Sequence, residues 1–164
     1  MASSSEVILV HGAWADGSSW AKVISLLVAE GHAVTAVQLP LTSFGDDVAT
    51  VKRAVALAKA PIILVGHSYG GAVISEAGSD PKVEALVYVA AFAPDAGESA
   101  GSLGVGVEPA PLGAEVRPDA EGYLKLTQSG VSGSFAQDLT EAEKLVLYCA
   151  PRAFFRNCAQ PACR

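Results

Sequence analysis

Four short apolar runs alternate with segments of helical periodicity along the first half of the chain. The runs are residues 7–10, 33–39, 61–65 and 83–92. Each has the length of a buried strand, and the links between them carry apolar residues at intervals of three and four, as on one face of a helix. Such alternation calls for parallel strands joined by right-handed crossovers. The sequence therefore predicts an α/β fold with a doubly wound parallel sheet.

Composition fits this fold and excludes several functions. With 164 residues, 51% hydrophobic and 17% charged, the chain has the apolar character of one domain whose parallel sheet is covered on both faces. A net charge of −6 argues against nucleic acid and anionic membrane surfaces as partners. No apolar run approaches the ~20 residues that span a bilayer. The N-terminus also lacks the pattern of a signal peptide, so we expect a cytoplasmic protein.

The second half of the chain has a different character. Residues 95–147 are rich in small residues and have little periodicity, which predicts a cap or lid of short elements after a core over residues 1–94. Residues 148–164 hold all three cysteines, three of the five arginines and no acidic residue. This tail is what a shifted reading frame or a truncated gene would give, and equally what a natural short helix and a loose end would give.

The cysteines offer no recognisable metal or redox motif. Cys149, Cys158 and Cys163 are odd in number, and their spacing fits neither a zinc site nor a CxxC pair. We favour free thiols over a disulfide or a metal role, and we expect neither a metal nor a cofactor.

A chemical motif follows the third apolar run directly. Residues 66–71, Gly-His-Ser-Tyr-Gly-Gly, predict a sharp strand-to-helix turn whose small residues avoid clashes and whose Ser68 hydroxyl stands exposed above the sheet. A serine hydroxyl needs a base to become a nucleophile. The three histidines, His11, His32 and His67, all precede Ser68 in the chain.

Three segments together resemble a known superfamily. They are Ile-Leu-Val-His-Gly-Ala-Trp at residues 8–14, the turn at residues 66–71, and Tyr-Val-Ala-Ala-Phe-Ala-Pro-Asp at residues 88–95. Over about residues 6–145 the chain resembles the α/β-hydrolases, in particular the bacterial esterase branch related to plant hydroxynitrile lyases and methylesterases. The resemblance implies that Ser68 is the nucleophile and that the backbone N–H groups of Ala13 and Tyr69 form the oxyanion hole.

The family continues with two further strand–helix units that carry the catalytic acid and then the histidine. The chain stops before both, so we expect a hydrolase fold that lacks its last strand–helix units through C-terminal truncation. Asp95 is the best substitute acid, although a turn or cap role is favoured. His11 and His67 are expected to have structural roles. Trp14, Tyr123 and Phe135 are candidates for an apolar pocket, with core packing as the alternative.

The resemblance and the βαβ spacing also predict the order of the strands. Residues 7–10 and 61–65 are expected at the centre, with residues 33–39 beside the first and residues 83–90 beside the second. This order leaves residues 83–90 as an exposed apolar edge, which invites pairing, so we expect a homo-oligomer.

The leading functional hypothesis is a serine hydrolase of carboxylesterase type that acts on small apolar esters. Turnover is expected to be slow because no histidine follows Ser68. Two alternatives remain open: a non-catalytic protein of hydrolase fold that binds a small apolar ligand, and a truncated inactive product.

Overall fold

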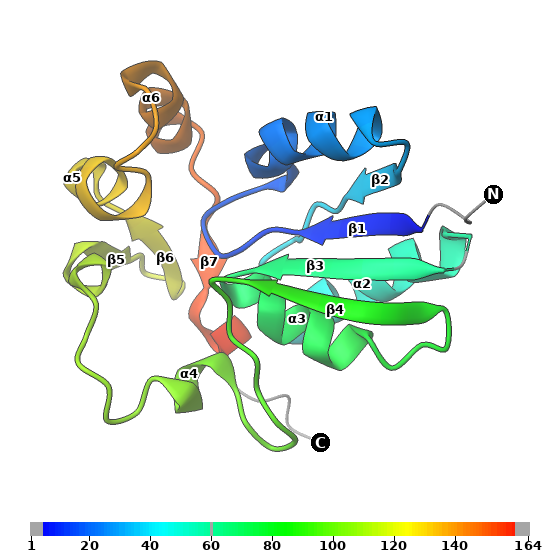
Figure 1. Ribbon diagram of the computed structural model, residues 1–164. Coiled ribbons are helices and arrows are strands. Elements are labelled where there is room, and N and C mark those ends of the chain that lie inside the picture. The colour runs from blue at the N-terminus through cyan, green and yellow to red at the C-terminus, as the bar shows by residue number, and fades with distance from the viewer. Residues whose placement is uncertain (1–4, 60, 160–164) are drawn as a thin grey trace.

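The computed structural model describes residues 5–59 and 61–159, and its main sheet has four parallel strands in the order β2-β1-β3-β4 (Figure 1). The strands are β1 (Glu6–Val10), β2 (Ala33–Ala36), β3 (Ile62–His67) and β4 (Val83–Val89). The predicted fold class and strand order are therefore confirmed. Two strands are shorter than expected, since β2 ends at Ala36 and β4 at Val89.

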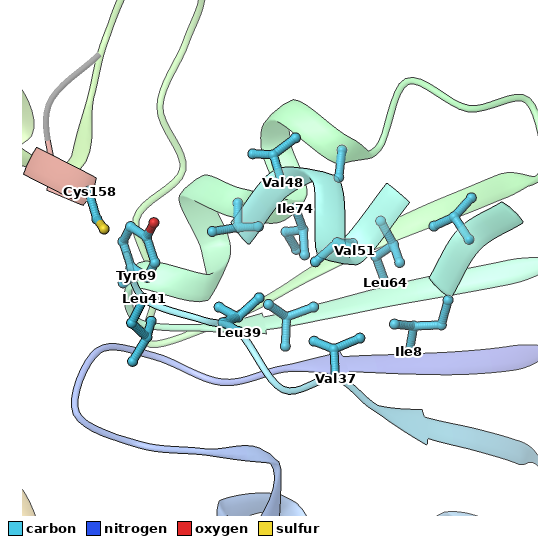
Figure 2. Packing of buried hydrophobic residues seen from close by; sticks show 14 of the residues in the cluster. Ile8, Val37, Leu39, Leu41, Val48, Val51, Leu64, Tyr69, Ile74 and Cys158 are labelled. Carbon is cyan, nitrogen blue, oxygen red and sulfur yellow. The ribbon is translucent and has the colours of Figure 1, made fainter. Parts of the chain in front are cut away.

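Helices cover both faces of this sheet. The helices α2 (Phe44–Leu57) and α3 (Tyr69–Ala77) pack on one face, where Val48, Val51 and Ile74 meet Ile8 and Leu64 of the strands (Figure 2). The 3₁₀-helix η1 (Gly17–Trp20) and α1 (Ala21–Ala29) lie on the other face. The two layers place the carboxyl ends of β1 and β3 side by side, which is where ligands of such sheets bind.

Capping side chains stand at the starts of η1 and α2. Asp16 accepts a hydrogen bond from Ser18 N at the start of η1, and the Ser43 hydroxyl accepts one from Asp46 N at the start of α2. Each side chain supplies an acceptor to a helix N–H that has no partner within its own helix.

The early end of β2 has a local cause. Val37 N still donates to Leu9 O of β1 at 3.0 Å, but Leu39 N donates to His11 Nε2 at 3.0 Å, so a bond to a side chain follows the last bond to a strand. The chain then turns away from the sheet toward α2.

The second half of the chain consists of short elements. They are α4 (Ala100–Leu103), η2 (Pro111–Glu115), β5 (Val116–Pro118), β6 (Tyr123–Leu126), α5 (Gln128–Gly130), the π-helix η3 (Val131–Phe135), α6 (Glu141–Cys149), β7 (Phe154–Phe155) and η4 (Arg156–Ala159). The strands form a small antiparallel sheet in the order β5-β6-β7. Thr140 caps α6 in a reciprocal capping box with Glu143.

The first residues of the C-terminal tail are part of the folded core. Phe154 pairs with Leu124 in the small sheet and is only 5% exposed, and Phe155 N donates to Leu41 O at 3.0 Å. Cys158 is buried beside Tyr69 (Figure 2). The tail thus joins the small sheet to the main core.

Within the two described ranges, no helix has both the length and the apolar character that crossing a bilayer requires.

Candidate active site

Ser68 lies in a strained turn between β3 and α3. Its φ of 52° and ψ of −122° belong to a region that non-glycine residues rarely adopt, at a cost of about 1–3 kcal/mol. The turn is tight: a Cβ added to Gly66 would lie 2.6 Å from Gly70 O, and one added to Gly70 would lie 2.6 Å from Val10 O. Only glycine fits at either position. The local sequence therefore produces the predicted sharp strand-to-helix turn, with Ser68 at the N-terminus of α3.

The loop after β1 packs directly against this elbow. A Cβ added to Gly12 would lie 2.9 Å from Ser68 Cβ and 3.2 Å from His67 O. Ala13 and Tyr69, which follow Gly12 and Ser68, are both buried. In the part of the chain that the structure describes, neither backbone N–H has a hydrogen-bond acceptor. Both amides are thus available as donors close to the serine.

The buried Tyr69 side chain fixes the start of α3 from the protein interior. Its hydroxyl donates to Asp47 Oδ2 at 2.7 Å, and Leu41 N donates to Asp47 Oδ1 at 2.8 Å. Burial raises the pKa of Asp47 and that of Tyr69, and burial also raises the pKa of the neighbouring Cys158 thiol to about 12. Asp47 was not anticipated from the sequence. Its one signal is an acidic residue directly after the Ser43–Asp46 cap.

His11 is committed to structural hydrogen bonds. Its Nε2 accepts from Leu39 N, which places the proton on Nδ1, and Nδ1 donates to Gly12 O at 2.8 Å. Burial lowers the pKa of His11, which keeps the ring neutral. With both nitrogens engaged, the ring holds the Gly12 loop in place, as the structural interpretation of this histidine predicts.

His67 points to the α1 face of the sheet. It is half-buried, packs edge-to-face against Trp20 with ring centroids 6.4 Å apart, and has a pKa lowered by burial. Its Nδ1 lies close to Gly12, since a Cβ there would be 3.4 Å away. No hydrogen bond joins Ser68 Oγ to either His11 or His67, all of which lie in the described ranges.

A large cavity of about 650 Å³ opens beside His67. His67 and Val89 lie at its sheet end, Trp20 and Val23 on one wall, and Val146 of α6 on the other. The lining is mostly apolar. An ion pair of 3.2 Å between Lys22 of α1 and Glu143 of α6 joins the two walls. Ser68 does not line this cavity.

The three residues predicted to line an apolar pocket do not share one cavity. Trp14 and Phe135 pack edge-to-face, with centroids 6.3 Å apart, and line a small cavity of about 20 Å³, while Phe135 also lines the large one. Trp14 Nε1 donates to Leu124 O at 2.9 Å and ties the β1 loop to the small sheet. Tyr123 lines neither cavity and packs on Phe155, with ring centroids 5.0 Å apart.

Asp95 sits in an exposed turn after β4. Its carbonyl accepts from Glu98 N at 3.0 Å, and its own N–H donates to Glu98 Oε2 at 2.8 Å. The turn role favoured for this residue matches the geometry, and no printed bond links its carboxylate to Ser68 or to a histidine in the described ranges.

Between residues 5 and 159, residue 60 apart, no three His, Cys, Asp or Glu side chains gather in a way that could hold a metal ion.

Known proteins share this architecture and part of the sequence. The chain is 38% identical over 105 residues to salicylic acid-binding protein 2 of Nicotiana tabacum, covering 54% of this chain and 40% of that protein. It is 35% identical over 106 residues to the carbendazim hydrolyzing esterase of Nocardioides sp. (strain SG-4G), covering 56% of this chain and 44% of that protein. The chain thus spans about two fifths of the length of these curated relatives.

A solved structure is similar to this chain over a larger share of its length. The pyrethroid hydrolase of Sphingobium faniae JZ-2 superimposes with a TM-score of 0.73 at 29% identity, covering 85% of this chain and 63% of that one. A family model described as "Alpha/beta hydrolase family" matches residues 7–163. The resemblance seen in the sequence is confirmed, and the chain belongs to the alpha/beta hydrolase family, among relatives that include esterases.

Proposed function

We propose that the chain is a serine hydrolase scaffold of carboxylesterase type for small apolar esters, with Ser68 as the nucleophile. The observation that carries the proposal is the strained elbow of Ser68 packed against the Gly12 loop. Backbone strain of this kind concentrates at functional sites, because a fold tolerates it only where the surroundings enforce it. The names of the esterase relatives support the same class of reaction.

The arrangement supports the steps of acyl transfer. Ser68 Oγ attacks the ester carbonyl carbon, and the carbonyl oxygen takes the negative charge. The N–H groups of Ala13 and Tyr69 then donate to this oxyanion, and each such donor is worth about 3–4 kcal/mol. The alcohol leaves with a proton, and water hydrolyses the acyl-Ser68 ester to release the acid and regenerate the hydroxyl.

Deprotonation of Ser68 is the slow step of this scheme. Both nitrogens of His11 are engaged, and His67 makes no hydrogen bond to Ser68 Oγ. The hydroxyl proton therefore passes to solvent. An oxyanion hole and binding alone accelerate such reactions about a thousandfold over water, as in triad deletions.

Hydrolysis of p-nitrophenyl acetate and labelling by a fluorophosphonate probe test the proposal. We expect slow release of p-nitrophenol and weak labelling by the probe, and Ser68→Ala should abolish both. Ser25→Ala should keep both, because Ser25 is an exposed serine of α1. Activity that survives Ser68→Ala contradicts the role of Ser68. Fast turnover that depends on Ser68 contradicts the slow deprotonation and directs attention to His11 and His67.

The large cavity favours a second candidate, a binding protein for a small apolar ligand. Its volume of about 650 Å³ lies in the range of small-molecule sites, and its lining is mostly apolar. Binding of 8-anilinonaphthalene-1-sulfonate should then persist in Ser68→Ala and fall in Ala142→Trp, which fills the cavity from α6. Binding that is lost in Ser68→Ala and unchanged in Ala142→Trp contradicts this candidate.

A further inference from the structure

The Trp14 side chain, in the loop after β1, is held by contacts on several sides. Its Nε1 donates to Leu124 O at 2.9 Å, and its ring packs edge-to-face against Phe135 and Phe154, with centroids 6.3 and 5.8 Å apart. The three partners belong to β6, η3 and β7. One side chain thus joins this loop to three elements of the second half of the chain, and the position of its ring is fixed.

The backbone of Trp14 is strained as well. Its φ of 60° lies in the left-handed region, which bulky side chains rarely adopt. Strain of this kind persists only where the surrounding structure enforces it, and it concentrates at functional sites. Ser68, with a φ of 52°, belongs to the turn on which Gly12 packs, so two strained residues lie in two loops that touch.

Trp14 lies beside the proposed oxyanion hole. A Cβ added to Gly12 would lie 2.9 Å from Ser68 Cβ. Consecutive Cα atoms are ~3.8 Å apart, so the Cα of Trp14 is at most about 8 Å from that of Gly12. On its other side the Trp14 ring packs on Phe154, whose ring packs on that of Tyr69 with centroids 4.9 Å apart. The indole ring therefore borders the place where an ester carbonyl would bind.

Little free volume remains beside the Trp14 ring. The cavity that this residue lines holds about 20 Å³, which is room for about one water molecule. Its other walls include Leu126 of β6, Val131 of η3 and Leu147 of α6. An alkyl group of several carbons does not fit there while Trp14 is in place.

We propose that Trp14 restricts the acyl group of the substrate to the size of acetyl or propanoyl. The inference rests on the proposed function, in which the acyl group stays bonded to Ser68 Oγ while the alcohol leaves. A departing alcohol needs an open path, so the acyl group lies on the closed side, against the indole ring. A longer acyl chain meets this ring. The substrate class is therefore esters of short carboxylic acids.

The large cavity of about 650 Å³ is the alternative place for the acyl group. Ser68 does not line it, and Phe135, which packs on Trp14, lines both cavities and so lies between them. Trp20 lies on a wall of the large cavity. The two tryptophans of the chain mark the two alternatives, and substitution of each one distinguishes them.

Hydrolysis of p-nitrophenyl acetate, butanoate and hexanoate tests the size limit, with the rate of Ser68→Ala subtracted. Wild type should prefer acetate. Trp14→Gly should raise the hexanoate-to-acetate ratio of kcat/KM at least about tenfold, since one methylene in a hydrophobic pocket changes discrimination about 10–200-fold. Glycine adopts a φ of 60° without strain, which offsets part of the packing that this variant loses. Trp20→Ala should leave the ratio as in wild type.

Each other pattern of rates overturns the proposal. An unchanged ratio in Trp14→Gly or a preference of wild type for hexanoate contradicts the size limit, and a ratio that rises in Trp20→Ala instead assigns the acyl group to the large cavity. If no ester is hydrolysed faster than by Ser68→Ala, the proposed function itself fails. Thermal midpoints show whether the variants fold. Where one does not, Trp14→Phe and Trp20→Phe replace the pair, and the ratio should rise in Trp14→Phe alone.

Indole binding tests the position of the ring without catalysis. Trp14→Gly leaves an apolar cavity with the shape of the lost side chain, and such cavities bind small aromatic ligands. Indole should raise the thermal midpoint of Trp14→Gly more than that of wild type and lower its hexanoate-to-acetate ratio toward the wild-type value. N-methylindole, which cannot donate to Leu124 O, should have a smaller effect on both. Equal shifts of the midpoint by indole in Trp14→Gly and wild type overturn the proposal.

Discussion

The Tyr69 hydroxyl donates a 2.7 Å hydrogen bond to the buried carboxylate of Asp47, while the backbone N–H of the same tyrosine lies next to Ser68. The bond ties the first residue of α3 to the first turn of α2. Because Asp47 also accepts from Leu41 N, both carboxylate oxygens are satisfied. One side chain thus holds the proposed oxyanion donor in position from the protein interior.

Tyr69→Phe should destabilise the fold by about 1–3 kcal/mol, because it leaves one oxygen of the buried Asp47 carboxylate without a donor. Urea denaturation measures the change. Tyr148→Phe, at an exposed position on α6, should stay within about 0.5 kcal/mol of wild type. Equal effects of the two substitutions contradict the importance of the Tyr69–Asp47 bond.

Asp47 should also make stability depend on pH. Burial raises its pKa above the ordinary value of 3.8, and the neighbouring Asp46 acts in the same direction, while the bonds from Tyr69 and Leu41 oppose the rise. The folded protein then holds the proton more tightly than the unfolded chain. Stability therefore falls as pH rises from about 3.8 through the raised pKa.

Urea denaturation of wild type and Asp47→Asn between pH 4 and 7 checks this sign. Wild type should lose stability relative to Asp47→Asn as the pH increases, because the asparagine carries no charge to bury. If the difference in free energy of unfolding between wild type and Asp47→Asn stays constant with pH, or if wild type gains stability relative to Asp47→Asn as the pH increases, the pKa of Asp47 is not raised.

The part of this site that is local in the chain could be predicted from the sequence. The elbow depends on Gly66 and Gly70 within one turn, and the strand order follows from βαβ connections. The Tyr69–Asp47 bond could not be predicted, because it depends on how α2 packs against α3. The same holds for Trp14 Nε1, whose acceptor Leu124 O lies far along the chain and is placed by tertiary packing alone.

Gly12→Ala should disturb the elbow, because the added Cβ would approach Ser68 Cβ to 2.9 Å. We expect a loss of about 1–3 kcal/mol in the free energy of unfolding, and weaker fluorophosphonate labelling of Ser68. Gly113→Ala is the control, since a Cβ there meets no atom within 4 Å. Unchanged stability and labelling in Gly12→Ala contradict the close packing of the two loops.

Ser68→Gly should make the protein more stable while removing the nucleophile. Glycine adopts the φ of 52° without steric strain, so the substitution relieves part of the cost, although it also adds freedom to the unfolded chain. We expect a net gain of about 1 kcal/mol in the free energy of unfolding. Ser25→Gly, in the interior of α1, should lose about 0.5–1 kcal/mol, because its backbone is helical and unstrained. If Ser68→Gly loses as much as Ser25→Gly, the elbow stores no strain, and the observation that carries the proposed nucleophile fails with it.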